Sequence, residues 1–260
     1  MFRACEFTYA GTPASMFGLF LADIGSKSHA DNSFGNKANV VETRIARRVR
    51  PIHFGVRYHD EPLKFNLIFC GEKPMDRYQM QEVSDWLTGY QDYQWLTIDQ
   101  PDLEHMRFRC LIQSLTPVSV GWFPVGFEAQ VICDCPYGYS YPFQKKVALS
   151  GAAKLDFHNY TTAHEKLRPE LRVILTQGCT EFKARNLTTG EELSLSGLPS
   201  SGCSFIVDNE NEIITAKDGS DLYKGFNYRF FSMERGDNKL EFVGNGEVEI
   251  GGMFLYNVGA

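Results

Sequence analysis

The chain has 260 residues, of which 43% are apolar and 22% charged, and its formal net charge is −6. These values are ordinary for a globular protein with one large domain or two average ones. Thirteen basic and sixteen acidic residues lie on each side of Ser140, so neither half has the basic excess of a nucleic-acid-binding protein. Twenty Phe and twelve Tyr favour a β-rich fold.

The opening segment, residues 2–26, predicts two strands separated by Gly and Pro turns. Its apolar stretch from Met16 to Ile24 is too short to cross a bilayer. Glu6 lies where a secretory signal carries positive charge, so we expect no secretory leader. The seven cysteines lack a framework spacing and are expected to be reduced thiols in a protein that folds in the cytosol.

A basic cluster accompanies the next predicted strand, residues 41–49, which alternates apolar and polar positions and ends at Arg50-Pro51. The cluster consists of Arg44, Arg47, Arg48 and Arg50. Three interpretations stay open. The arginines cover a solvated edge strand, form a patch at a subunit interface or facing a lumen, or contact phosphate directly.

One helix is predicted among many strands. Apolar residues recur at helical spacing from Met80 to Tyr90, Asp76 and Gln79 have the spacing of a capping box, and Gly89 follows as a C-terminal glycine. Strands are predicted over residues 63–69 and 127–133. Residues 106–120 are expected to form a strand pair that is interrupted at Thr116-Pro117. A single helix argues against alternating βαβ units.

The best domain boundary is the Pro-, Gly- and Tyr-rich stretch of residues 136–142. Beyond it, short strands alternate with turn signals, a pattern typical of a β-sandwich or jelly roll. Predicted strands pair as hairpins over residues 181–187 and 191–195, 205–207 and 212–215, and 227–233 and 239–243. Single strands are expected over residues 171–176 and 247–250.

The sequence carries no recognisable catalytic or metal-binding pattern, and we predict no catalytic, cofactor-binding or metal-binding residue. The six histidines have no ligand spacing, and no phosphate-binding loop or nucleophile elbow is present. Cys133 and Cys135 are the closest cysteine pair, and they are interpreted as ordinary strand cysteines rather than metal ligands. Acidic pairs such as Glu191 and Glu192 have the residue types of glycoside hydrolysis, but acids at turns are the usual surface of a β protein.

Aromatic residues are frequent in the second half of the chain. They serve either as core or as a platform on which a sugar stacks. The platform candidates are Tyr223, Tyr228 and Phe231.

Ordered motifs along the chain resemble the distal tail proteins of long-tailed bacteriophages. The first is F-x-Y-x-G followed by S-x-F-G-L-x-L and I-G-S, within residues 7–26. A V-x-x-W-L helix at residues 83–87 and a strand ending in R-C at Cys110 follow, and then C-x-C-P-Y at residues 133–137. The second half adds N-x-T at 159–161, N-x-T-T-G at 186–190 and F-x-V-D at 205–208. The family's usual opening of the second domain is replaced by a polar run, residues 161–168.

This resemblance implies a mainly β protein with one helix. Residues 1–137 would be a ring-forming tail domain, and residues 138–260 a galectin-like β-sandwich. The family implies a non-enzymatic homo-hexameric ring at the tail tip of the virion, assembled in the host cytoplasm. Its partners would be the tail tube protein and a tail-tip protein, with a receptor-binding protein or host glycan as a further partner. DNA would be passing cargo only, and no membrane would be bound.

One further expectation concerns assembly, and two alternative functions stay open. The loop of residues 26–39, or the strand after it, is expected to add to a neighbouring subunit's sheet. The alternatives to a structural ring protein are a carbohydrate-binding or host-adhesion module in the second half, and a glycoside hydrolase on a β-sandwich scaffold.

Overall fold

The computed structural model describes residues 6–25, 38–58, 61–101 and 103–258. Contacts divide the chain into two units, Met1–Tyr139 with Tyr256–Ala260, and Ser140–Leu255. The chain therefore passes from the first unit to the second inside the predicted boundary stretch, and its last residues return to the first. The roles predicted for residues 1–137 and 138–260 stay predictions. The predicted fold class, mainly β with one helix, is confirmed.

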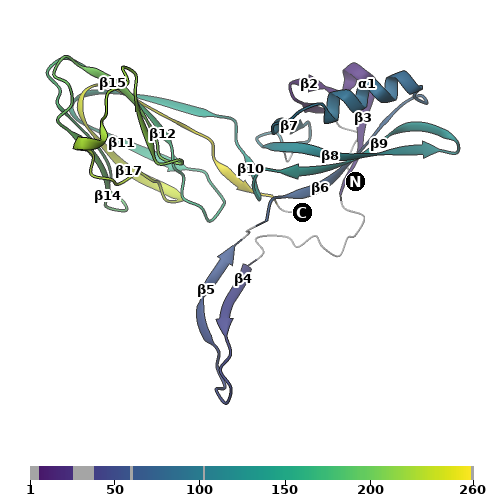
Figure 1. The fold of residues 1–260 in the computed structure, drawn as a ribbon, viewed down its shortest axis with the longest axis horizontal. Helices are drawn as coiled ribbons and strands as arrows, with labels where there is room; N and C mark the ends of the chain where they lie inside the picture. The colour runs from purple at the N-terminus through teal and green to yellow at the C-terminus, as the bar shows by residue number, and fades with distance from the viewer. Residues whose placement is uncertain (1–5, 26–37, 59–60, 102, 259–260) are drawn as a thin grey trace. The chain divides into compact units, whose positions relative to one another are not determined.

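The first unit is built on an antiparallel nine-stranded sheet (Figure 1). Its main strand order is β2-β1-β7-β8-β9-β6-β3, and β10 pairs with both β8 and β18. The strands are β1 (Phe7–Tyr9), β2 (Thr12–Pro13), β3 (Leu19–Gly25), β6 (Lys64–Gly71), β7 (Gln94–Ile98), β8 (Arg107–Val120), β9 (Phe123–Cys133), β10 (Tyr137–Tyr139) and β18 (Leu255–Asn257). A short 3-10 turn, η1 (Ala14–Phe17), lies between β2 and β3.

The one α-helix in the described part of the chain, α1 (Arg77–Thr88), begins at the predicted capping box. The Asp76 carboxylate accepts from the backbone N–H of Gln79 at 2.8 Å, and the Gln79 side chain accepts from the Asp76 backbone at 3.0 Å. Trp86 faces the sheet: its indole N–H donates to the Tyr9 carbonyl at 3.2 Å, and its ring stacks on Phe17 with centroids 4.6 Å apart. The helix thus closes one side of the core of the first unit.

The strand β8 corrects the expectation of an interrupted pair over residues 106–120. It runs unbroken through Pro117, which lies opposite Phe127 of β9. The other neighbour of β8, β7, pairs only with residues 107–110. Beyond Cys110 one side of β8 therefore has no partner strand among the described residues, and at such an edge the missing N–H of a proline breaks no ladder.

The second unit is a two-layered β structure with its own core. Its strand order is β14-β13-β17-β12-β15-β16, with β11 paired along β17. The strands are β11 (Phe143–Asn159), β12 (Glu170–Leu175), β13 (Glu181–Asn186), β14 (Glu191–Ser196), β15 (Cys203–Asp208), β16 (Ile213–Ala216) and β17 (Gly236–Gly252). A short 3-10 turn, η2 (Tyr223–Gly225), precedes β17.

The long strand β17 creates both layers. Its first half pairs with β13 and its second half with β12. Between the halves lie Gly244 and Gly246, with φ of 158° and 139°, and a Cβ on Gly246 would lie 2.0 Å from the Ile174 carbonyl oxygen. Phe182 of β13 and Phe205 of β15 then meet with ring centroids 5.7 Å apart, although no ladder joins their strands.

The hairpin predicted over residues 227–233 and 239–243 is wrong. Residues 227–233 form no strand, and only Met233 makes an isolated bridge, to Leu167. The partner of residues 236–252 is instead β11, a strand of 17 residues that the turn signals did not indicate. The long-range ladder takes the backbone groups that a local hairpin would have used.

Candidate functional site

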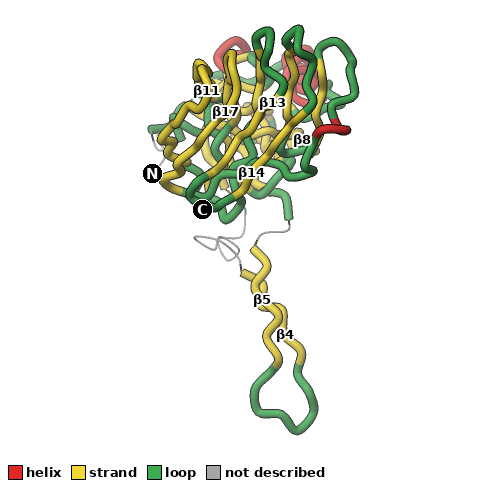
Figure 2. The backbone as a smooth tube through the Cα atoms, turned by 90° about the vertical axis from the view of Figure 1, so that its left-hand side faces the viewer, coloured by secondary structure: helices red, strands yellow, loops and turns green. Residues whose placement is uncertain are grey.

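The hairpin of β4 (Ala38–Thr43) and β5 (Ile52–Tyr58) forms a two-stranded sheet of its own and exposes apolar side chains. Figure 2 shows the two strands side by side and closed by a loop. Val40 lies opposite Val56, and a bulge between Val41 and Glu42 leaves Phe54 without an opposite residue. Within the described residues β4 and β5 pair only with each other.

Apolar side chains of this hairpin are open to solvent. Phe54 is 65% exposed, Val40 57% and Val49 fully exposed; Ile45 and Val56 are exposed too. A two-stranded ribbon is at best marginally stable in water, because it has no layer against which to bury its apolar side chains. The hairpin therefore has the composition of a surface that is covered in an assembly.

The arginine cluster lies in the loop that closes this hairpin, which corrects the strand predicted over residues 41–49. β4 ends at Thr43 and β5 begins at Ile52, so the chain reverses between them, and Arg47 takes a φ of 68°. The predicted residues Arg44, Arg47, Arg48 and Arg50 are thus brought together, and all are exposed. Arg44 Nε lies 3.8 Å from the Glu42 carboxylate oxygen Oε1. Among the described residues, the other three cluster arginines have no ion pair.

The charge of the hairpin is opposite to that of the rest of its unit. Residues 40–56 contain four arginines and one glutamate, whereas residues 61–139 contain five basic and eleven acidic residues. Exposed acids include Glu82 on α1 and Asp92 after it. Such opposite charges are the kind that make two surfaces electrostatically complementary. Of the loop 26–39, which is expected to reach a neighbour, residues 26–37 lie outside the described residues.

A second apolar surface, which the sequence patterns did not single out, lies at the turn between β8 and β9. Trp122 is 96% exposed, and Val120 and Phe123 beside it are also exposed. The signal in the sequence is the absence of any charged residue from Ser114 to Phe127. Isolated apolar side chains on a surface are common, but a Trp at a turn with two apolar neighbours is a contact candidate.

The predicted sugar platform is only partly assembled. Phe231 is fully buried in the core of the second unit, so it offers no ring face, and its inclusion was wrong. The two tyrosines do meet: the rings of Tyr223 and Tyr228 have centroids 6.3 Å apart, and Tyr228 is 71% exposed. The rings of Phe226 and Tyr228 also meet, with centroids 5.4 Å apart. One open tyrosine ring therefore remains.

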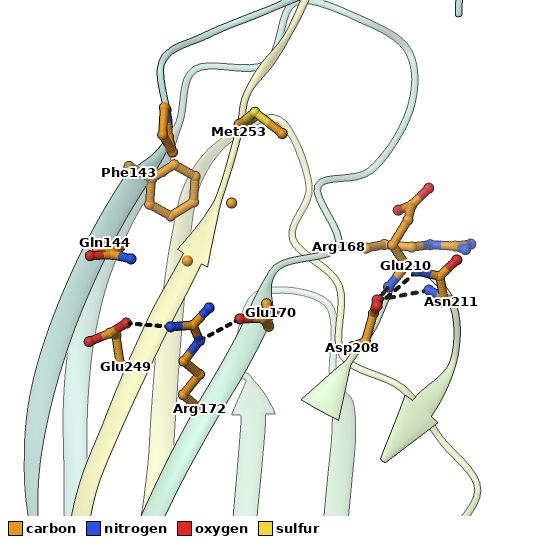
Figure 3. A pocket seen from close by; sticks show the side chains of 13 residues that line it. Phe143, Gln144, Arg168, Glu170, Arg172, Asp208, Glu210, Asn211, Glu249 and Met253 are labelled. Carbon is orange, nitrogen blue, oxygen red and sulfur yellow. Dashed lines mark hydrogen bonds and ion pairs between the residues drawn. The ribbon is translucent and has the colours of Figure 1, made fainter. Parts of the chain in front are cut away.

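A shallow pocket of about 340 Å³ lies on the second unit (Figure 3). Arg172 crosses it, joined to Glu170 at 2.6 Å and to Glu249 at 4.0 Å. Burial acts to raise the pKa of Asp208, but hydrogen bonds from Asn211 and the Glu210 backbone outweigh it and hold this pKa below its usual range. These carboxylates are therefore occupied by their own partners, and Asp208 is suited to shaping a turn rather than to donating a proton.

Neither a metal centre nor a membrane helix emerges from the part of the chain that the structure describes. There, no group of three or more His, Cys, Asp or Glu residues is arranged to hold a metal ion. No described helix is long and apolar enough to span a bilayer.

Comparisons with known proteins agree with the resemblance seen in the sequence. Residues 2–135 match a family model described as a phage tail protein N-terminal domain, and residues 137–251 match one described as a phage tail C-terminal domain. A search of curated protein sequences found no match.

Two solved structures are similar to this chain. The crystal structure of the SPP1 Dit protein, described as a paradigm of the hub adsorption apparatus in phages infecting Gram-positive bacteria, is 11% identical with a TM-score of 0.71. The match covers 97% of this chain and 100% of that one. A chain of the activated phage P2 baseplate with Ca is 10% identical with a TM-score of 0.47, covering 96% and 98%.

The first family model alone spans more than half of the chain, and the likeness to SPP1 Dit identifies the fold. The resemblance predicted from the motifs is confirmed. The chain belongs to the family of phage tail proteins and has the Dit fold.

Proposed function

We propose that this protein is a non-enzymatic structural component at the distal end of the tail of a long-tailed phage. Six copies close a ring that joins the tail tube protein to a tail-tip protein and the receptor-binding apparatus. The ring assembles in the host cytoplasm and remains in the virion at the tail tip. Membership of the phage tail protein family supports this role.

The single observation that carries the proposal is the β4–β5 hairpin. It exposes Val40, Phe54 and Val56 and belongs to no larger sheet among the described residues. Covering these side chains with a partner supplies the missing hydrophobic layer. In a closed ring each copy gives its hairpin to one neighbour and receives a hairpin from the other, which is a heterologous contact repeated until the rotation closes.

Opposite charges orient this contact. The loop with Arg44, Arg47, Arg48 and Arg50 approaches the acidic part of the neighbouring first unit, where acids outnumber basic residues by eleven to five between residues 61 and 139. Arginine suits such a place because its planar guanidinium group pairs with carboxylates through two parallel hydrogen bonds. We assign these four residues to the subunit interface in preference to the lumen of the ring. The strand β4 contributes to the same interface by adding to the neighbour's sheet or by packing on it.

Electron microscopy tests the proposal. The purified full-length protein is imaged alone and after addition of purified tail tube protein. The proposal expects rings with six-fold symmetry in at least the second sample. Compact monomers in both samples, even at high protein concentration, would overturn it.

A carbohydrate-binding role for the second unit is the alternative, and the open ring of Tyr228 beside Tyr223 favours it. Stacking of a sugar on an exposed aromatic ring is a common mode of recognition. Glycan-array binding by the full-length protein tests it. Binding that is lost in Tyr228→Ala and kept in Tyr78→Ala, a change at another exposed tyrosine on α1, would support this role. No binding by the wild-type protein would exclude it for the glycans on the array.

A further inference from the structure

Two cysteines face each other at the centre of the first unit. Cys110 of β8 and Cys133 of β9 are directly opposite in the antiparallel ladder, so their side chains lie on the same face of the sheet. Both belong to the buried core, with exposures of 0% and 1%, and both are free thiols. Cys110 and Cys133 are 23 positions apart in the sequence, and this spacing alone does not predict that they face each other.

The hydrogen bonds around this pair define its geometry. The Cys133 N–H donates to the Leu63 carbonyl at 2.9 Å, away from β8. The neighbouring Asp134 N–H donates to the Arg109 carbonyl at 3.0 Å, toward β8. Cys110 and Cys133 are therefore a non-hydrogen-bonded pair, the type in which opposite Cα atoms lie only about 4.5 Å apart. This distance is at the short end of the range that a disulfide spans, roughly 4.4 to 6.8 Å.

We propose that Cys110 and Cys133 are a covalent modification site, a dithiol that closes to a cross-strand disulfide when the protein meets a small peroxide. In the first step one thiolate attacks the peroxide, the O–O bond breaks, and the sulfur becomes a sulfenic acid. In the second step the other thiol displaces water from that sulfur and the S–S bond forms. Two thiols and one hydrogen peroxide thus give one disulfide and two waters.

The surroundings of the pair slow this oxidation, so it proceeds only where no reductant reverses it. Hydrogen bonding with Cys110, followed by burial, raises the pKa of Cys133 above its ordinary value. The thiolate is the reactive form, so a pair held as thiols reacts slowly. Cytosolic reductants also oppose the disulfide, whereas an extracellular protein meets no such pool. The site therefore fits a protein that folds in a reducing cell and then works outside it.

The consequence of closure is a stapled sheet. β8 and β9 are the longest strands of the first unit, and β9 ends at Cys133, just before the segment that leads through β10 to the second unit. A cross-link here encloses the residues between Cys110 and Cys133 and constrains the unfolded chain. We expect the melting temperature to rise by about 5 to 10 °C, the size typical of a disulfide closing such a loop in a domain of this size.

Peptide mapping tests the proposal on the full-length protein. The reductant is removed, the folded protein is treated with hydrogen peroxide, and the remaining thiols are alkylated in denaturant. Trypsin leaves both cysteines in one peptide because no Lys or Arg lies between Arg109 and Lys145. A glutamyl endopeptidase cuts after Glu128 and separates them. The expected result is a linked pair of peptides, with fragmentation placing the bond on Cys133 rather than Cys135.

Variants provide the matched controls. Cys110→Ala should lose both the linked peptides and the rise in melting temperature. Cys70→Ser should keep both, because Cys70 lies on the adjacent strand β6 opposite Phe20 and Gly126, neither of which has a thiol. The proposal is overturned if the folded wild-type protein alkylates fully at Cys110 and Cys133 after peroxide, or if the link forms only after unfolding. These outcomes are independent of whether the protein forms a ring.

Discussion

Val40 and Val56 lie directly opposite each other across the β4–β5 hairpin, and both side chains are exposed. Opposed valines are usual in a sheet whose one face is buried. Here that face has no covering layer among the described residues. The assembly proposed above follows from this pair together with the arginines at the closing loop.

Aspartates in place of Val40 and Val56 should prevent ring assembly while leaving the subunit folded. Both side chains face solvent, so the free energy of unfolding should change by less than about 0.5 kcal/mol, whereas two charges in a covered apolar contact are strongly unfavourable. Light scattering measures assembly, and urea unfolding measures stability. Ile174→Asp, at an exposed position of the second unit, is the control. Rings that form normally from the double variant would argue against a role for the hairpin.

Reversing charge in the loop should weaken association and remove its salt dependence. We expect Arg47→Glu with Arg48→Glu to lower the association constant at least about tenfold, because carboxylates then face carboxylates. The wild-type ring should dissociate more readily as salt concentration rises, since exposed charge pairs are screened. Sedimentation velocity over a salt series measures both effects. Arg168→Glu, an exposed change on the second unit, should behave as wild type. Equal association of all three proteins would contradict the prediction.

A buried amide supports the second unit from within. Asn209 is 1% exposed, its side-chain N–H donates to the Pro169 carbonyl at 2.5 Å, and its oxygen accepts from the Phe231 N–H at 2.7 Å. Asn209→Ala leaves both backbone groups without these partners and should reduce the free energy of unfolding by about 1 to 3 kcal/mol. Asn211→Ala, on the exposed turn two residues later, should cost much less. Urea unfolding of the two variants side by side measures the difference.

Acid should destabilise the second unit through Glu191. Burial acts to raise the pKa of this carboxyl, but hydrogen bonds from Ser232 and Lys166 outweigh it and hold the pKa below its ordinary value. A carboxyl with a lowered folded-state pKa contributes stability above its unfolded pKa, about 4.3, and loses it as the pH falls through the folded value. Because Glu191 is about one-third exposed, the contribution should stay below about 1 kcal/mol.

The measurement for Glu191 is the free energy of unfolding between pH 7 and pH 3. The wild-type curve should fall more steeply below pH 4.5 than that of Glu191→Gln, which has no carboxyl to protonate. Glu210→Gln, on the exposed turn after β15, should follow the wild type. Parallel curves for the wild type and Glu191→Gln would show that this carboxyl does not contribute.

The sequence predicted those features that depend on local chemistry. Asp76 caps the helix because the two residues of the capping box are close neighbours in the sequence. The turn at Thr188–Gly190 joins β13 and β14 as expected. Long-range pairing was not predictable in the same way. β11 and β17 pair along their full lengths across nearly 80 residues of chain at their nearest ends, and this ladder replaced the local hairpin expected at residues 227–233.

The candidate site shows the same division. The sequence alone identifies the cluster of Arg44, Arg47, Arg48 and Arg50. The alternation of apolar and polar residues from Val41 to Val49, however, predicts a strand where the chain turns. Alternation cannot distinguish a strand from a loop when the reversal is set by the pairing of Thr43 with Ile52. Phe231 was named for its type alone, and only packing against Phe242 shows that it belongs to the core.

The mass of the assembled particle tests the central claim most directly. Native mass spectrometry of the full-length protein, over a range of concentrations at low salt, resolves the number of chains per particle. We expect a dominant species of six chains that is lost in the Val40→Asp, Val56→Asp variant. A wild-type protein that remains a single chain at every concentration, or that closes with another number of copies, would contradict it.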